Sequence, residues 1–173
     1  MISKNINARF IFITAAICVA AISRVFPHIP NFTPIAAMAL FGGAYLKDKR
    51  LAFIVPMAAM LLSDLFIGFH NTMIYVYAAF AFTTFIGLGL RKGVKVGTLF
   101  IASLASSVIF FLVTNFGVWA ANGFQSGAIG MISTYVLGVP FFRMTLLGDL
   151  FYNTILFGAF YLAQLRFPKL AKI

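Results

Sequence analysis

Long apolar segments separated by short polar stretches dominate the pattern of hydrophobic and polar positions along the chain. A helix that crosses a bilayer needs about 20 mostly apolar residues, and fewer where flanking Lys or Arg side chains reach the interface. Six segments meet this requirement, approximately residues 6–23, 32–46, 51–69, 72–90, 96–116 and 145–165. The pattern therefore predicts an all-α membrane protein, with residues 1–173 forming a single integral membrane domain of six transmembrane helices.

Basic residues gather at alternate ends of these segments. One side holds Lys4, Arg9, Lys47, Lys49, Arg50, Arg91, Lys92, Lys95, Arg166, Lys169 and Lys172, whereas the other holds Arg24 and Arg143. Because Lys and Arg concentrate in cytoplasmic loops, we expect both termini in the cytoplasm. A missing or additional span would mix the two sets, so their separation also favours six spans.

The composition excludes an ordinary soluble domain. The chain is 62% hydrophobic and 9% charged, with a mean hydropathy of +1.03, whereas a soluble domain carries about a quarter of charged residues. A net charge of +10 could indicate nucleic-acid binding, but here the basic residues form short clusters between apolar runs, which is typical of membrane loops. We therefore expect a multi-pass protein of the bacterial inner membrane, surrounded by the lipid bilayer and without a nucleic-acid partner.

The first segment also resembles a signal peptide, because Lys4 and Arg9 precede an apolar run with a small-residue site near Ala21. Ile17 stands before Cys18, where a lipoprotein signal would have a small residue, and this favours a retained helix. Cys18 is the single cysteine, so no intrachain disulfide forms.

The longest predicted loop, residues 117–144, lies on the outer side. It contains Gly123, Gly127, Gly130 and Gly138, and its apolar stretch 128–139 is too short to span a bilayer. Long loops of this kind are usually functional, so we interpret it as a lid or a re-entrant segment.

Polar residues converge near the outer ends of the spans. Ionisable groups inside a membrane are costly, so Asp64 and Asp149 are the first candidates for a site. Other candidates at or just above this level are Asn31, His28, His70, Tyr75, Asn115, Trp119, Arg143 and Asn153. The inner halves consist mainly of Ala, Leu, Ile, Phe and Gly, which predicts an outward cavity above an apolar floor.

These candidates also have structural explanations. Asp149 would lie in the first turn of the last span, where the helix dipole favours an acid. Asp64 is too far from a helix start for that, so we expect it to bind substrate or to pair with Arg143. We expect Arg143 to pair with Asp64 or Asp149 unless a cationic group of the substrate does so instead. On this reasoning Asp64 should matter more for substrate binding than Asp149. The histidines and aromatic residues also suit a membrane interface.

An enzyme lacks positive support in the sequence. The strings LLSDLF from Leu61 and LLGDLF from Leu146 place the two acids in similar settings, but an intramembrane aspartyl protease would have Gly-x-Gly-Asp, of which only Gly148-Asp149 is present. No phosphate loop, HExxH, GxSxG or Cys/His metal spacing occurs, so we expect no catalytic residue, metal or cofactor.

Ala16 and Ala20 lie four residues apart in the first span. Small residues at this spacing allow a second helix to approach closely, either from a partner subunit or from within the chain.

Four longer strings carry a family resemblance: NFTPIAAMALFGGAYL from Asn31, PMAAMLLSDLFIGFH from Pro56, TNFGVWA from Thr114 and PFFRMTLLGDLFYNTILFG from Pro140. Over nearly the whole chain, they resemble an uncharacterised family of membrane proteins similar to the substrate-binding S component of energy-coupling-factor (ECF) transporters. The resemblance implies that helices four to six and the outer loops hold a vitamin or related micronutrient. It also implies that Ala16 and Ala20 contact a transmembrane T subunit, which two cytoplasmic ATPases drive.

The substrate stays open at this point, since the resemblance extends to carriers of several vitamins. The N-terminal metal-binding His of the nickel and cobalt members has no match at Met1, Ile2 or Ser3, while His28 or His70 could reach the cobalt of a corrinoid. Two other functions are considered: a structural or assembly subunit without substrate, and an intramembrane enzyme. An outward cavity lined by Asp64, Asn115 and Asp149 would favour the transport subunit, whereas a solid bundle would favour the structural one.

Overall fold

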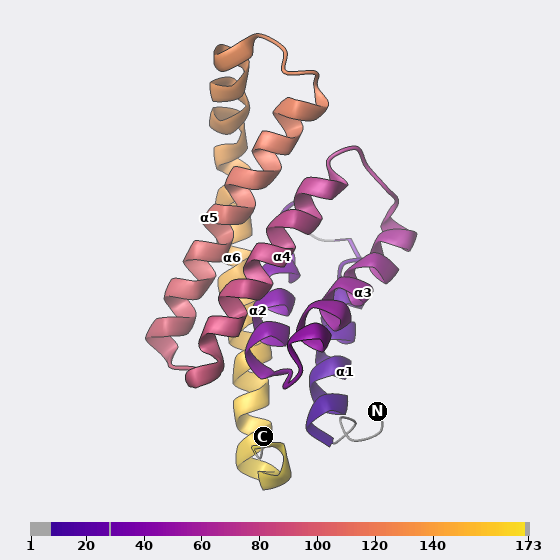
Figure 1. The fold of residues 1–173 in the computed structure, drawn as a ribbon, viewed down its shortest axis with the longest axis vertical. Helices are drawn as coiled ribbons and strands as arrows, with labels where there is room; N and C mark the ends of the chain where they lie inside the picture. The colour runs from indigo at the N-terminus through magenta and orange to yellow at the C-terminus, as the bar shows by residue number, and fades with distance from the viewer. Residues whose placement is uncertain (1–7, 28, 172–173) are drawn as a thin grey trace.

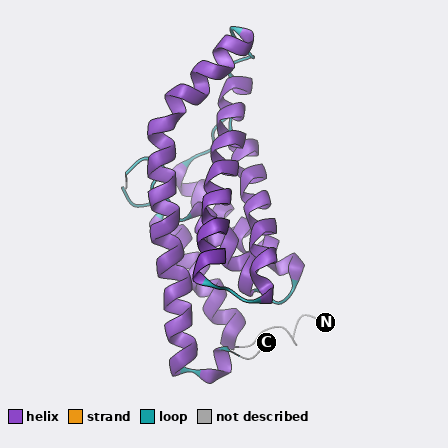
Figure 2. Ribbon diagram, turned by 90° about the vertical axis from the view of Figure 1, so that its left-hand side faces the viewer, coloured by secondary structure: helices purple, strands orange, loops and turns teal. Residues whose placement is uncertain are grey.

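The computed structural model describes residues 8–27 and 29–171, which form six α-helices and no strand (Figures 1 and 2). The helices are α1 (Ala8–Ser23), α2 (Ile35–Tyr45), α3 (Lys49–Ile67), α4 (Met73–Gly89), α5 (Val96–Ala121) and α6 (Gly127–Arg166), with 3₁₀ turns η1 (Leu90–Lys92) and η2 (Pro168–Leu170). The predicted all-α class is confirmed. The first five helices lie within the predicted segments or close to their ends.

Four of the described helices are long and apolar enough to cross a membrane: α3, α4 continued through η1, α5 and α6. Helices α1 and α2 are apolar but shorter, with 16 and 11 residues. These lengths and compositions are those of an integral membrane protein.

Helix α2 forms the centre of the bundle and contacts each of the other five α-helices. All its residues from Ile35 to Ala44 are buried, and at the usual rise its 11 residues are about 16 Å long. A helix that is apolar on every side is expected in the interior, where no face meets water. This helix is therefore the scaffold around which the other elements are arranged.

Two glycines bring α2 and α4 into backbone contact. A Cβ atom added at Gly43 would lie 2.6 Å from the Thr84 carbonyl oxygen, and one added at Gly87 would lie 2.7 Å from the Leu40 carbonyl oxygen. Small residues at helix crossings permit this approach in membrane bundles. The crossing leaves no room for any larger side chain at either position.

Two arginines form hydrogen bonds with backbone carbonyl oxygens at the end of the bundle where α2 ends. Arg91 donates to the carbonyl oxygens of Gly43 at 2.9 Å, Leu46 at 2.5 Å and Lys47 at 3.1 Å. Arg9 donates to the Leu170 carbonyl oxygen at 3.0 Å, which joins the start of α1 to η2. The last carbonyls of a helix have no partner within the helix, so Arg91 satisfies the open end of α2.

The prediction of a loop over residues 117–144 is wrong. Helix α5 continues to Ala121, residues 122–126 make the connection, and α6 starts at Gly127 and runs for 40 residues. At the usual rise α6 is about 60 Å long, roughly twice the hydrocarbon thickness of a bilayer, and the α5–α6 hairpin extends past the other helices (Figures 1 and 2).

The glycines suggested a loop because glycine often marks a turn, but Gly138 has a packing role. The space that its side chain would occupy is filled by Asn115 and Phe111 of α5. Pro140 also lies inside α6 without ending it. The predicted lid thus consists of the end of α5, the short connection and the first part of the continuous helix α6.

Candidate functional site

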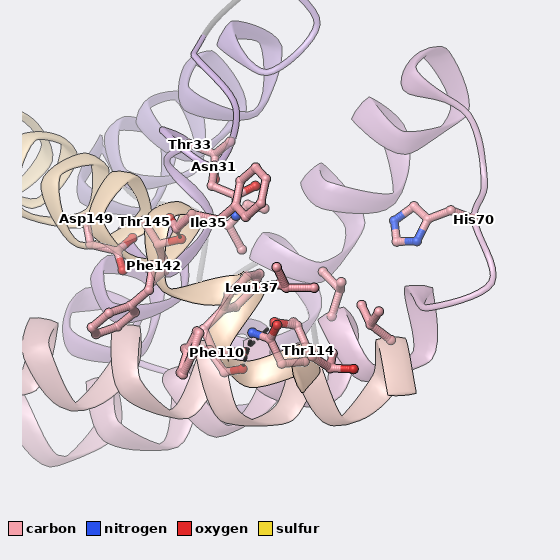
Figure 3. A pocket seen from close by; sticks show the side chains of 18 of the residues that line it. Asn31, Thr33, Ile35, His70, Phe110, Thr114, Leu137, Phe142, Thr145 and Asp149 are labelled. Carbon is pink, nitrogen blue, oxygen red and sulfur yellow. Dashed lines mark hydrogen bonds between the residues drawn. The ribbon is translucent and has the colours of Figure 1, made fainter. Parts of the chain in front are cut away.

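A cavity of about 570 Å³ lies where α2 begins, between α4, α5 and α6 (Figure 3). It is at the opposite end of α2 from the carbonyl groups that Arg91 binds. The segment from α1 to α2 contributes Arg24, Asn31 and Thr33, the α3–α4 turn contributes His70, and α2 contributes its first residues, Ile35 and Ala36. The α5–α6 hairpin forms the largest wall, with Phe110, Phe111, Thr114, Asn115, Val118, Asn122, Thr134, Leu137, Gly138, Phe141, Phe142, Thr145 and Asp149.

Asp149 is the most deeply buried polar residue of the cavity lining, with 2% of its surface exposed. The Ser107 hydroxyl donates to Asp149 Oδ2 at 2.6 Å, and no cation pairs with this carboxylate among the described residues. Its position follows from Gly148, because an added Cβ there would lie 3.0 Å from the Thr33 backbone nitrogen. This close approach brings Asp149 beside the start of α2.

The helix-dipole explanation for Asp149 is wrong. Helix α6 begins at Gly127, so Asp149 lies in the middle of the helix, where the dipole has no local effect. The helix dipole therefore does not explain an acid at position 149, and the Asp149 side chain lines the cavity.

Asp64 belongs to a buried ion pair. Arg24 Nη2 lies 2.7 Å from Asp64 Oδ1, and the Tyr77 hydroxyl donates to Asp64 Oδ2 at 2.8 Å. Arg24 also donates to the Ser63 hydroxyl and, at 3.4 Å, to the Met60 carbonyl oxygen. Both oxygens of Asp64 are thus occupied, and Arg24 lines the cavity whereas Asp64 does not.

The predicted pairing of Arg143 with Asp64 or Asp149 is wrong. Arg143 is exposed on α6, and Arg24 takes the role instead. The sequence offered Arg24 only as the second basic residue on the outer side. Arg24 and Asp64 are 40 positions apart, so only the packing of α1 against α3 could identify the pair.

Three further predicted residues line the cavity: Asn31, His70 and Asn115. Asn115 donates to the Phe111 carbonyl oxygen at 2.8 Å, and the His70 ring is 2.9 Å from the Thr72 hydroxyl at the exposed rim. Sequence reasoning did not select Thr145, or the phenylalanines of the hairpin, because hydroxyl and aromatic residues are common in every span.

Other predicted residues lie outside the cavity lining. Tyr75 fills the space above Gly117, and Trp119 packs edge-on against Phe124 and Phe116. Asn153 is buried one turn beyond Asp149 and donates to the Ser103 hydroxyl at 3.0 Å. These three residues have packing or hydrogen-bonding roles. His28 lies outside the described residues.

The Ala16 and Ala20 pair contributes to packing within the chain. Ala20 is 7% exposed, and Ala16 packs against the same hydrophobic core. The outward face of α1 is instead formed by Ile11, Ala15, Val19 and Ile22. A partner helix that docks on α1 would meet this second face.

The cavity presents the Asp149 carboxylate, the Arg24 guanidinium that is paired with Asp64, the His70 imidazole, and amide and hydroxyl groups. Because Asp64 is occupied by Arg24 and Tyr77, the described part of the chain presents no pair of free carboxylates to a common point. The described residues also contain no group of three or more His, Cys, Asp or Glu that could hold a metal ion. The arrangement is suited to holding a small molecule by shape, hydrogen bonds and charge.

A search of curated proteins and a search of solved structures both gave no match. A family model matches residues 4–170, and its description is a family of unknown function, DUF6580. The match covers almost the entire chain. The protein is therefore a member of the DUF6580 family.

Proposed function

We propose that this protein is the substrate-binding membrane subunit of a micronutrient uptake system of the ECF type, and that it captures a small organic molecule in the cavity beside Asp149. The observation that carries the proposal is the cavity itself. Its volume of about 570 Å³ falls within the range of about 300–1,000 Å³ that is common for small-molecule sites. Half of its lining residues are apolar or aromatic and half carry polar or charged side chains, so it can contact both the apolar surface and the polar groups of a small molecule.

The distribution of basic residues between the two ends of the bundle indicates which side of the membrane the cavity faces. Basic residues lie at the end where α2 finishes, and Arg9 and Arg91 are bonded to the backbone there. Under the positive-inside rule this end faces the cytoplasm, so six passes of the chain would leave the cavity open to the outer side. Helix α2 is buried from Ile35 to Ala44 and touches α4 at Gly43 and Gly87, so packed side chains and backbone would close the cavity toward the cytoplasmic end.

Transport also needs an energy source, which this chain would obtain from partners. A T subunit with two cytoplasmic ATPases would supply it, and the outward face of α1 offers the partner a continuous apolar surface. A structural subunit without substrate is the competing function, but a solid bundle would serve that purpose without a cavity.

Mass spectrometry of small molecules that co-purify with the detergent-solubilised protein tests the proposal. We compare the wild type with Thr134→Trp, which places a large side chain in the cavity lining, and with the matched control Ser133→Trp, whose neighbouring position is exposed and outside the lining. A compound should accompany the wild type and Ser133→Trp but not Thr134→Trp. The absence of any bound compound after expression in rich medium, or equal retention by all three proteins, would contradict small-molecule capture.

A further inference from the structure

We propose that the ligand of this cavity is an organic cation built on a planar ring, with its positive charge held by Asp149. This inference rests on the proposed function, because it specifies the chemical class that the same cavity binds. Three observations carry it: the balance of buried charges, the position of Asp149 in the lining, and the aromatic walls around it.

The chain has three acidic residues, and Asp149 is the buried one that has no cation beside it among the described residues. Asp48 caps α3, accepting hydrogen bonds from the backbone nitrogens of Arg50 at 2.7 Å and Leu51 at 3.3 Å. Asp64 is neutralised by Arg24 at 2.7 Å. Asp149 has the Ser107 hydroxyl as a donor but no cation among the described residues.

Neither of the nearby arginines is placed to neutralise Asp149. Arg24 reaches the cavity, but its two terminal nitrogens bind Asp64, Ser63 and the Met60 carbonyl oxygen. Arg143 is exposed on α6 and does not line the cavity. An anionic ligand would have to compete with Asp64 for Arg24, whereas a cationic ligand would meet an unmatched acid.

The absence of a cation beside Asp149 in the described part of the chain is important because the Asp149 side chain is buried. A carboxylate taken out of water is stabilised only when it is paired and hydrogen-bonded, and Asp149 is 2% exposed. A ligand cation would complete this ion pair inside the cavity. Such a contact is strong in a desolvated site, so it would contribute to both affinity and selectivity.

The walls of the cavity favour the same class of ligand. Phe110, Phe111, Phe141 and Phe142 come from both helices of the hairpin, and Figure 3 shows Phe142 beside Asp149 and Thr145. Aromatic faces attract cations, and they also stack on planar rings. In Figure 3 the side chains of Asn31 and Thr33 lie near Ile35 and Thr145 and across the cavity from Phe110, where they can form hydrogen bonds with polar substituents of the ring.

The test uses two planar bicyclic probes of similar size and opposite charge, 1-methylquinolinium and 1-naphthoate. Their binding to the full chain in detergent micelles is measured by isothermal titration calorimetry. We expect the cation to bind the wild type at least ten-fold more tightly than the anion. Asp149→Asn should weaken cation binding at least ten-fold, and it should not weaken anion binding, because it removes a like charge from the cavity.

Asp48→Asn is the matched control, because it removes the same charge at the opposite end of α2 and asparagine remains a good helix N-cap. It should bind both probes as the wild type does. The wild-type comparison does not depend on the folding of any variant. Equal or tighter binding of the anion, no binding of either probe, or full cation binding by Asp149→Asn would overturn the cation assignment.

The two proposals fail in different ways. If a neutral or anionic compound co-purifies, is lost from Thr134→Trp and is retained by Asp149→Asn, the cavity captures a ligand and the cation assignment is refuted. If no compound depends on Thr134, the proposed function is refuted together with the inference. A co-purifying cation that is lost from both variants supports both.

Discussion

Replacing Asp64 by asparagine should destabilise the protein, because it would leave Arg24 buried without an anionic partner. Arg24 is 9% exposed and Asp64 is 4% exposed. Removing one member of such a buried pair costs about 3–5 kcal/mol. Arg24 also borders the cavity, where water can reach it, so we expect the lower end of that range, about 3 kcal/mol.

The measurement is thermal unfolding in detergent, followed by circular dichroism. For a chain of this size each kcal/mol shifts the unfolding temperature by about 2–4 °C, so Asp64→Asn should lower it by roughly 6–12 °C. The double variant Arg24→Met with Asp64→Leu removes both charges and should recover part of this loss, since apolar pairs often replace buried ion pairs without cost. Recovery is incomplete because the Tyr77 hydroxyl loses its acceptor. Asp48→Asn retains a good N-cap residue at the start of α3 and should unfold close to the wild type.

The reasoning would be refuted if Asp64→Asn unfolded at the wild-type temperature, or if the double variant were no more stable than the single one. The first result would mean that the ion pair contributes nothing to stability. The second would mean that Asp64 acts through contacts other than Arg24. Either result would also reopen the assignment of Asp64 as a structural residue and Asp149 as the binding residue.

Three further predictions concern packing, hydrogen bonding and topology. Gly43→Val should prevent accumulation of folded protein because the α2–α4 crossing has no room for a side chain, whereas Gly89→Ala, which meets nothing within 4 Å, should behave as the wild type in size-exclusion chromatography. Tyr77→Phe should cost about 1.5–3 kcal/mol in the same unfolding assay, because it removes a hydrogen bond to a charged acceptor; an unchanged unfolding temperature would contradict that contact. After replacement of the native cysteine, an impermeant maleimide should label Gln125→Cys but not Lys49→Cys in intact spheroplasts, and the reverse pattern would invert the orientation.

The predicted spans were accurate where an apolar segment ended at charged residues. Lys47 to Arg50 and Arg91 to Lys95 separate α2 from α3 and α4 from α5, and charged side chains are costly within the hydrocarbon region. The start of α6 was missed because no such charges mark it. Glycine and Pro140 indicate a turn by their backbone preferences, but at Gly138 the absence of a side chain serves the contact with α5.

The candidate site was predicted in part. Asp149, Asn115, Asn31 and His70 were selected because polar residues are rare in such an apolar chain, and all four line the cavity. The partner of Asp64 was not predictable, because Arg24 and Arg143 both lie at the outer ends of apolar segments and the sequence does not distinguish them.

By itself the sequence determined the helical class, the helix boundaries next to charged loops and several of the polar residues that line the cavity, since each depends on local hydropathy and on the cost of charge in lipid. Only the tertiary structure decided which polar groups meet. Arg24 reaches Asp64 because α1 packs against α3, and this pairing leaves Asp149 facing the cavity. Contacts between distant segments depend on helix rotation and close approach at glycines, which hydropathy does not specify.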